Sequence, residues 1–298
     1  MVSSSSPGYR LRGLLAREQI LVVPGAFDAL SARLAERAGF EAVYMSGAGT
    51  VNALAGLPDI GLLSVTEMAT NARYVANAVR VPVFADADTG YGNALNVMRT
   101  VREYAQAGLA GLHIEDQVAP KRCGHVSGKE CVPLEEMIGK VRAAVAARSD
   151  PDFVIIARTD ARAPLGFDEA VRRGRAYAEA GADVIFPEAL QTREELASYA
   201  REVRVPLLAN MTEFGKTPYL TAREFEMLGY RIVIFPASAM RVALKIMQAF
   251  YADLKRDGTQ TPWLDRMMTR AELYDLIEYA RYTENEREFL GVSQDPVA

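Results

Sequence analysis

The stretch Ala107-Gly108-Leu109-Ala110-Gly111-Leu112-His113-Ile114-Glu115 shows how the chain is built. A helix-like segment ends at Gly108, because glycine just past a helix end takes the left-handed conformation that other side chains resist. An apolar run follows and ends in an acid. The same order of glycine and apolar run returns at Gly39, Gly181 and Gly229. The chain therefore repeats one unit of helix, glycine and strand.

Eight short apolar runs are spread along the chain. They lie at residues 20–23, 42–46, 81–85, 110–115, 153–157, 183–187, 205–209 and 232–236. They are rich in valine, isoleucine and leucine and lack polar alternation, which is the pattern of parallel strands buried on both faces. Alternation with helical segments predicts an α/β fold, a (β/α)8 TIM barrel. A doubly wound open sheet is the alternative, although residues 24–28 lack its glycine-rich dinucleotide turn.

The domain organisation follows from the absence of a linker. We expect one barrel domain over residues 1–298, with an N-terminal tail at residues 1–12. Residues 244–255 and 270–281 add more helical sequence than one barrel helix needs. We therefore predict additional C-terminal helices, an extension over residues 244–298 that packs on a neighbouring subunit.

Composition excludes several classes of partner. The net charge is −4 and there is no basic block, so neither nucleic acid nor an anionic membrane surface is expected as a partner. No apolar run approaches the ~18 residues that span a bilayer, and the first seven residues lack the apolar core of a signal peptide. The chain has two cysteines, Cys123 and Cys131. A disulfide between them is possible but not expected, and a cytoplasmic location is the default.

Polar residues stand where the predicted strands end. The strand exits carry Ser46, Asp86, Asp88, Glu115, Arg158, Glu188, Asn210 and Thr212. Barrel enzymes gather their chemistry at the C-terminal ends of the strands. A chain that needed only a packed barrel would have no reason to place these residues there, so we expect them to converge on one mouth.

Three of these residues form a candidate metal site. Asp86 and Asp88 are one residue apart and so share a strand face, and Glu115 ends the next strand. An anionic pocket of oxygen ligands suits Mg²⁺, or Mn²⁺. The alternative is that the acids only cap helices. Zinc is less favoured, because His113, Cys123 and His125 are too few and too irregularly spaced for a closed zinc site.

Arg158 directly follows a strand and presents a planar fork suited to a carboxylate. The alternative is a structural salt bridge to Asp160 or Glu188. His113 lies within a strand, and both a direct role and a role in orienting a neighbour stay open.

The run Lys121-Arg122-Cys123-Gly124-His125 is the most chemically specific motif. A cysteine beside two cations is partly a thiolate near neutral pH and can exchange a proton during turnover. His125 could tune that thiol or bind substrate. The alternative is a buried cysteine beside surface charges. By residue type, Cys131 is structural and Met211 belongs to the core.

These motifs resemble the isocitrate lyase and phosphoenolpyruvate mutase superfamily over nearly the whole chain, and within it the methylisocitrate lyases. The matching segments are residues 23–29, 46–47, 56–59, 86–88, 113–117, 121–125, 157–160, 186–188, 210–218 and 269–274. Ala48 departs from the pattern, because some members have a second glycine there. Residues 210–215 match the lyases rather than a carboxyphosphonoenolpyruvate mutase.

The resemblance implies a magnesium-dependent carbon–carbon lyase of propionate breakdown (the methylcitrate cycle). It would cleave (2S,3R)-2-methylisocitrate to pyruvate and succinate, with Mg²⁺ held by Asp86, Asp88 and Glu115. Catalytic roles would fall to Cys123 as acid, to Tyr44 as a candidate acceptor of the hydroxyl proton, to Arg158 and to His125. Substrate contacts would come from Ser46, Gly47, Ala48, Cys123, Gly124, Arg158, Glu188, Asn210, Met211, Thr212, Arg241 and Arg270.

The resemblance also suggests a homotetramer with exchanged C-terminal helices, and the Lys121–Lys129 loop looks able to close over the site. Related activities stay open: 2,3-dimethylmalate cleavage, oxaloacetate decarboxylation and phosphonomutase chemistry. An alternative of another class is a catalytically silent scaffold or metabolite-binding module.

Overall fold

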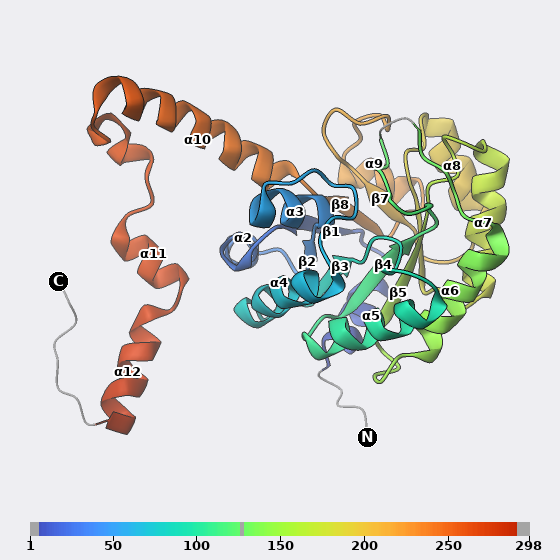
Figure 1. The fold of residues 1–298 in the computed structure, drawn as a ribbon, viewed down its shortest axis with the longest axis horizontal. Coiled ribbons are helices and arrows are strands. Elements are labelled where there is room, and N and C mark those ends of the chain that lie inside the picture. Colours follow the sequence, from blue (N-terminus) through green and yellow to red (C-terminus); the bar gives the residue numbers. More distant parts are fainter. Residues whose placement is uncertain (1–5, 126–127, 291–298) are drawn as a thin grey trace. The chain divides into compact units, whose positions relative to one another are not determined.

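The computed structural model describes residues 6–125 and 128–290. In this part of the chain, eight parallel strands form the predicted barrel (Figure 1). They are β1 (Leu21–Ala26), β2 (Val43–Met45), β3 (Val83–Asp86), β4 (Gly111–Glu115), β5 (Val154–Thr159), β6 (Val184–Pro187), β7 (Leu208–Asn210) and β8 (Ile232–Phe235). Their hydrogen-bonded order is β6-β5-β4-β3-β2-β1-β8-β7. An isolated parallel bridge between Ile185 and Leu207 joins β6 to β7 and nearly closes the barrel; we call this junction the seam.

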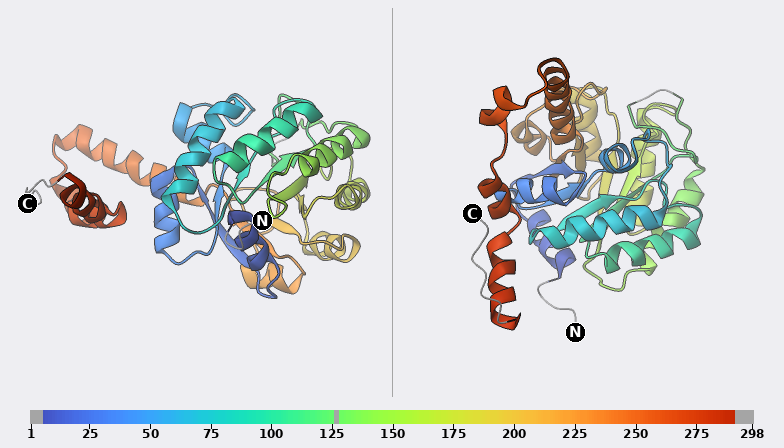
Figure 2. Two further views of the ribbon diagram at one scale, coloured as in Figure 1. Left: turned by 90° about the horizontal axis from the view of Figure 1, so that it is seen from below. Right: turned by 60° about the vertical axis from the view of Figure 1, so that its left-hand side comes forward.

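Helices between the strands form the outer layer. They are α2 (Ala29–Arg37), α3 (Gly47–Ala55), α4 (Val65–Ala78), α5 (Ala94–Gln106), α6 (Leu134–Ala146), α7 (Phe167–Glu179), α8 (Arg193–Glu202) and α9 (Ala222–Met227). The prediction that glycines in the left-handed conformation follow the helices is confirmed, since Gly108 after α5 and Gly181 after α7 have φ of +94° and +105°. Figure 2 shows these helices around the strands.

Two apolar layers hold the barrel together. The inner one fills the barrel with alternate strand side chains such as Val23, Phe84 and Ile156. The outer one joins the opposite strand faces to the helices, with Met68, Val101 and Tyr177 among its members. Burial on both strand faces is why the strands read as continuous apolar runs.

The N-terminal segment differs from the expected tail. Residues 7–12 belong to α1 (Pro7–Leu15), which Ser6 caps by accepting the Tyr9 N–H. Leu11 is fully buried, and it joins the inner apolar layer with Leu14. The helix forms because a serine cap is followed by proline at the first helical position and by apolar residues that can be buried. Residues 1–5 of the expected tail lie outside the described residues.

The chain divides into two compact units, Met1–Met240 and Arg241–Ala298. Helix α10 (Ser238–Asp257) begins before the predicted extension, and it is followed by η1 (Thr261–Arg266), α11 (Arg270–Leu276) and α12 (Tyr279–Leu290). The helix expected at residues 270–281 is thus two helices, separated where Glu278 has a positive φ. Residues 291–298 lie outside the described part. No described helix combines the length and apolarity needed to cross a membrane.

Candidate active site

Three carboxylates meet at the C-terminal ends of β3 and β4. Asp86 and Glu115 are the last residues of these strands, and all three side chains, Asp88 included, are buried. The backbone ties them together, because Asp88 N–H donates to Asp86 Oδ1 at 2.9 Å and Glu115 N–H donates to the Asp88 carbonyl at 2.9 Å. Asp88 has φ +46°, an uncommon conformation for a residue other than glycine.

Burial shapes the charge of this cluster. Burial raises the pKa of Asp88 to about 6, with help from Asp86 and against the opposing charge of Lys121. Burial also raises the pKa of Glu115 well above its ordinary value, although Arg158 opposes the shift. Desolvated carboxylates of this kind favour a bound cation.

Lys121 supplies part of that positive charge. Its ammonium is buried, lies 3.0 Å from Asp88 Oδ1 and forms a second ion pair with Asp59. Lys121 therefore reaches into the acidic cluster and does not serve as a free cation beside Cys123. Asp59 is a site residue for which no role was predicted, although it ends the matching segment at residues 56–59.

The donor set suits a hydrated hard cation better than a closed cage. In the described ranges, no three His, Cys, Asp or Glu side chains are arranged to hold a metal ion. Both oxygens of the buried Glu115 carboxylate lack a hydrogen-bond partner among those residues, and Arg158 Nη1 lies 3.3 Å from one of them. Mg²⁺ commonly binds through one or two carboxylates and keeps several waters. The residues fit that mode of binding.

Arg158 contacts three buried carboxylates of the site. It donates to both oxygens of Asp160, at 2.9 and 3.0 Å, and its nitrogens lie 3.3 and 3.4 Å from Glu115 and Glu188. Its guanidinium covers the Phe186 ring at 5.1 Å. The salt bridge to Asp160 that the sequence left as an alternative is present. Each guanidinium nitrogen of the buried Arg158 thus faces a protein carboxylate, and its contact with a substrate carboxylate stays a prediction.

Glu188 connects Arg158 to His125 and Asn210. Its oxygens contact His125 Nε2 at 3.0 Å and accept from Asn210 Nδ2 at 3.0 Å. Burial would raise the pKa of Glu188, but the charges of Arg158 and His125 hold it well below its ordinary value. His125 Nδ1 accepts the Lys216 N–H at 3.0 Å, so a neutral ring carries its proton on Nε2 and donates to Glu188. His125 is therefore occupied by Glu188 and by the loop after β7.

Cys123 lies on the loop that docks against this network. Cys123 is an exposed residue, and both Cys123 and Cys131 have free thiols. The next residue, Gly124, packs so closely that an added Cβ would be 2.5 Å from Arg158 Nη2. The loop therefore brings the backbone beside Cys123 against the guanidinium. Residues 126–127 of the Lys121–Lys129 loop lie outside the described residues, and loop closure stays a prediction.

The β2 exit holds Tyr44, Ser46, Gly47 and Ala48. The Tyr44 hydroxyl lies 2.8 Å from His113 Nε2. Burial raises the pKa of Tyr44 well above its ordinary value. Its help in accepting the substrate hydroxyl proton stays a prediction. Ser46 caps α3, and a Cβ on Gly47 would lie 2.3 Å from Asp86 Oδ2. Ala48 follows in the same first turn, half-buried, so α3 presents its N-terminus beside the carboxylates.

The remaining predicted residues differ in their surroundings. Asn210 ends β7, and Thr212 follows it half-buried. Met211 is buried with its sulfur 3.4 Å from the Leu220 nitrogen, as expected of a core residue. Arg241 and Arg270 belong to the second unit, and their contact with substrate stays a prediction.

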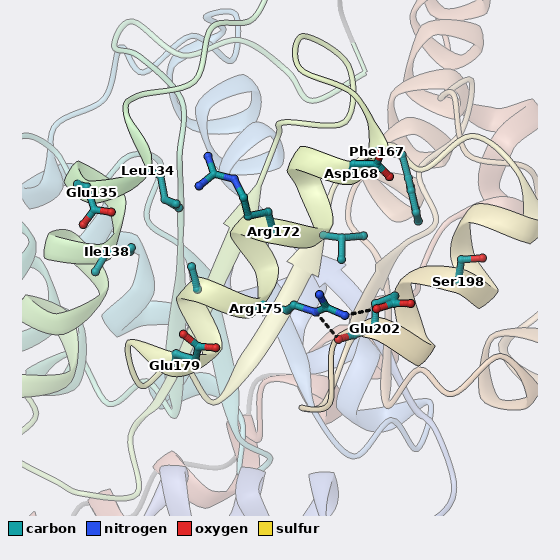
Figure 3. Close-up of a pocket in the computed structure, with 12 residues that line it drawn as sticks. Leu134, Glu135, Ile138, Phe167, Asp168, Arg172, Arg175, Glu179, Ser198 and Glu202 are labelled. Atoms are coloured by element: carbon teal, nitrogen blue, oxygen red, sulfur yellow. Dashed lines mark hydrogen bonds and ion pairs between the residues drawn. The ribbon is translucent and has the colours of Figure 1, made fainter.

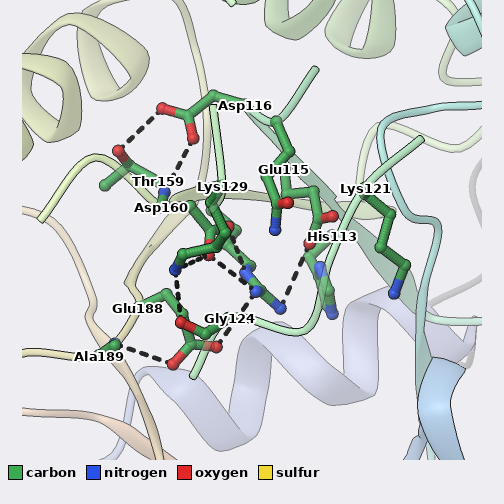
Figure 4. A network of polar contacts seen from close by, with 12 residues as sticks. His113, Glu115, Asp116, Lys121, Gly124, Lys129, Thr159, Asp160, Glu188 and Ala189 are labelled. Carbon is green, nitrogen blue, oxygen red and sulfur yellow. Dashed lines mark hydrogen bonds and ion pairs between the residues drawn. The ribbon is translucent and has the colours of Figure 1, made fainter. Parts of the chain in front are cut away.

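Three buried residues that the sequence did not single out as functional belong to the site: Asp116, Lys129 and Asp160. Lys129 contacts Asp160 Oδ1 at 2.7 Å and also donates to the Gly124 carbonyl. Asp160 was considered only as a partner of Arg158. Asp116, next to Glu115, accepts the Asp160 N–H at 2.8 Å and the Thr159 hydroxyl at 2.8 Å (Figure 4). This carboxylate fixes the backbone from which Asp160 extends.

A separate groove of about 800 Å³ lies among the outer helices α6, α7 and α8 (Figure 3). Its arginines already have partners, since Arg175 pairs with Glu202 across it and Arg172 pairs with Glu169. None of its lining residues is a strand-exit residue. The barrel mouth is therefore the candidate active site.

Comparison with known proteins gives consistent matches. Residues 11–255 match the family described as phosphoenolpyruvate phosphomutase. The 2-methylisocitrate lyase of Aeropyrum pernix is 51% identical, covering 98% of this chain and 94% of that protein. The 2,3-dimethylmalate lyase of Eubacterium barkeri is 49% identical, covering 94% and 97%.

Solved structures agree on the architecture. A crystal structure of 2,3-dimethylmalate lyase has a TM-score of 0.90 at 41% identity and covers 95% of each chain. The structure of phosphonopyruvate hydrolase in complex with oxalate and Mg²⁺ has a TM-score of 0.86 at 35% identity, covering 96% of this chain and 99% of that one.

Proposed function

Because the chain belongs to the phosphoenolpyruvate mutase and isocitrate lyase superfamily, and is a carbon–carbon lyase, we propose that it cleaves (2S,3R)-2-methylisocitrate to pyruvate and succinate. The observation that carries this proposal is the docking of the Cys123 loop on Glu188 and on Arg158, whose guanidinium also contacts the buried Glu115. A proton donor and a carboxylate-binding cation then share one mouth with a cation-binding cluster.

We propose Mg²⁺ as the cofactor, with Mn²⁺ able to replace it. Asp86, Asp88 and Glu115 would hold the ion, in part through water, as their burial and the unpartnered oxygens of Glu115 support. When bound, the ion would lower the pKa of the substrate hydroxyl and stabilise the negative charge that develops on its oxygen. The structure of phosphonopyruvate hydrolase in complex with oxalate and Mg²⁺ supports the same choice.

The protein residues would divide the remaining work. The N-terminus of α3, with Ser46 and Gly47, would bind the carboxylate of the pyruvate half. Breaking the carbon–carbon bond leaves negative charge on the succinate half. Arg158 and Asn210, with Thr212, would stabilise that charge, and preorganised donors of this kind contribute on the order of 10²–10³ in rate each. Cys123 would then donate its proton to the carbanion, which completes succinate. Tyr44, whose hydroxyl lies 2.8 Å from His113 Nε2, would help to accept the proton that the substrate hydroxyl loses.

Cleavage of 2,3-dimethylmalate is the second candidate, because that lyase of Eubacterium barkeri is nearly as similar to this chain. The two substrates differ in the number of carboxylates. We propose that Arg241 and Arg270 recognise the third one, because a tricarboxylate needs more cations than a dicarboxylate does. Oxaloacetate decarboxylation and phosphonomutase activity are less favoured, since neither makes use of those two extra arginines.

A substrate panel tests the assignment. Pyruvate release would be measured with Mg²⁺ from 2-methylisocitrate, 2,3-dimethylmalate and oxaloacetate. We expect the highest kcat/KM for 2-methylisocitrate and no turnover in chelator. A preference for dimethylmalate would reassign the substrate, and no pyruvate release from any of the acids would favour a non-catalytic scaffold.

We further propose a homotetramer that works in the cytoplasm in propionate catabolism. Analytical ultracentrifugation at the enzyme concentration used for the assay tests the assembly.

A further inference from the structure

The backbone on both sides of Cys123 is held by side chains from outside the Lys121–His125 run. On one side, the Gln117 amide accepts the Arg122 N–H at 2.9 Å and donates to the Arg122 carbonyl at 2.8 Å. On the other side, the Lys129 ammonium donates to the Gly124 carbonyl. Cys123 between them is an exposed residue with a free thiol. The backbone that carries the thiol is therefore held on both sides.

Gln117 is well suited to this contact. Its side chain is buried, and its amide offers one acceptor and a donor, which match the N–H and carbonyl of a single residue. Its backbone is fixed as well, because Gln117 forms an antiparallel bridge with Cys131, and Val118 N–H donates to the Glu130 carbonyl at 2.8 Å. The base of the loop thus holds the amide still.

Lys129 connects the loop to the substrate-binding cation. Its ammonium contacts Asp160 Oδ1 at 2.7 Å, and Asp160 accepts two hydrogen bonds from Arg158 (Figure 4). The Gly124 carbonyl, Lys129, Asp160 and Arg158 form one continuous chain of polar contacts. A shift of the loop at Gly124 would therefore disturb the carboxylate that orients the guanidinium.

We propose that Gln117 and Lys129 are positioning residues for proton delivery, which hold Cys123 in register with Arg158 without touching the reacting atoms themselves. The inference rests on the proposed function, in which Cys123 is the acid. Misplacement of a reacting group by about 1 Å costs on the order of 10²-fold in rate. Loss of either contact should therefore lower the rate of the chemical step more than substrate binding.

The substitution Gln117→Glu tests one contact at almost constant shape. The carboxylate can still accept the Arg122 N–H but repels the Arg122 carbonyl. We expect kcat to fall about 10- to 100-fold, with KM and succinate binding by calorimetry within about twofold. The exposed Gln19→Glu carries the same charge change and should keep wild-type kcat. A loss of succinate affinity as large as the loss of kcat would overturn the positioning role.

A double-mutant cycle separates positioning from general damage to the fold. If Gln117 acts through Cys123, Gln117→Glu should change the residual rate of Cys123→Ser by less than about twofold. The same factor in both backgrounds would overturn the inference. Lys129→Met tests the other contact in the same cycle. If circular dichroism shows that Gln117→Glu does not fold, the cycle is run with Lys129→Met alone.

The two levels of the proposal can fail separately. Normal turnover by Cys123→Ser would remove the acid role itself. A strongly impaired Cys123→Ser, together with wild-type kcat in Gln117→Glu and Lys129→Met, would leave the proposed function intact and overturn only the positioning role.

Discussion

Asp88 is the residue whose chemistry is most at odds with its surroundings. It is buried in a left-handed backbone conformation between Asp86 and Lys121, and its pKa is raised to about 6. A carboxylate held this way destabilises the fold when it ionises, and it gains most from a bound cation. Such a conflict between stability and local charge is typical of functional residues.

Asp88→Asn should therefore stabilise the metal-free protein. The folded pKa of about 6 lies above the ordinary 3.8, so the free energy of unfolding falls as the pH rises through this window. At pH 8 in chelator, we expect the variant to be more stable by roughly 1–3 kcal/mol, with little difference at pH 4. Urea unfolding at both pH values measures this, and the exposed Asp265→Asn is the control. A destabilised variant at pH 8 would contradict the prediction.

Asp88→Asn should also lose magnesium-dependent turnover, because one ligand charge is gone. Calorimetric titration with Mg²⁺ should show weaker binding than in the wild type. Full activity of the wild-type enzyme in chelator would remove the metal from the mechanism.

Cys123→Ser should keep substrate binding and lose the proton-transfer step. A serine hydroxyl is a far weaker acid than a thiol, so we expect kcat to fall roughly 10²–10⁴-fold. Steady-state pyruvate release measures this, with Cys131→Ser as the matched control on the partly buried cysteine. Comparable losses in both variants would point to a structural effect.

Some residues of the site could be predicted from the sequence and others could not. Asp86, Glu115 and Arg158 could be selected because they lie at or next to the C-terminal ends of strands of one barrel, and such ends share a mouth. Lys121 was interpreted as a neighbour of Cys123, but its ammonium reaches Asp59 and Asp88 instead. Such pairings depend on how loops fold back, which spacing along the chain does not encode.

At the level of elements, the sequence predicted where each strand lies, but it predicted the first residue of a strand less well. The runs at residues 81–85 and 205–209 become the shorter strands β3 and β7, which begin one or two residues after Pro82 and Pro206. Proline has no N–H to donate to a neighbouring strand, so regular pairing starts beyond it. Apolar character alone does not show that limit.

Helix α1 was missed because its polar start resembles a tail. The pair Ser6 and Pro7 is a helix-start signal that could have revealed it. Leu11→Ala should lower the free energy of unfolding by about 2–5 kcal/mol, because Leu11 is fully buried and the site cannot fully collapse. The exposed Leu30→Ala should change it by less than about 0.5 kcal/mol. Urea unfolding compares them, and equal effects would show that α1 adds little stability.

At the scale of the whole molecule, the barrel was predictable and the boundary of the C-terminal helices was not. The two units divide after Met240, inside α10. A continuous helix gives no sequence signal at a point where one unit passes into the next. Subunit assembly lies beyond what a single chain's pattern can specify.

Arg270 belongs to the second unit, and its predicted role tests whether that unit takes part in recognition. Arg270→Ala should raise KM for the tricarboxylate at least tenfold, since an unmatched carboxylate loses a charged partner. KM for 2,3-dimethylmalate should change much less. Steady-state kinetics on both acids measures this, and equal shifts would favour the dicarboxylate as the natural substrate.

The seam between β6 and β7 has a consequence for motion. Glu188 and Asn210 lie on the two sides of the seam and form a hydrogen bond across it. A product bound to both residues would therefore stabilise the part of the barrel wall with the fewest strand–strand hydrogen bonds. Amide deuterium uptake in residues 207–210 should therefore be faster than in β4 without succinate and slow down when succinate is added. Local opening of the barrel would then occur at the seam, and the bound product would suppress it.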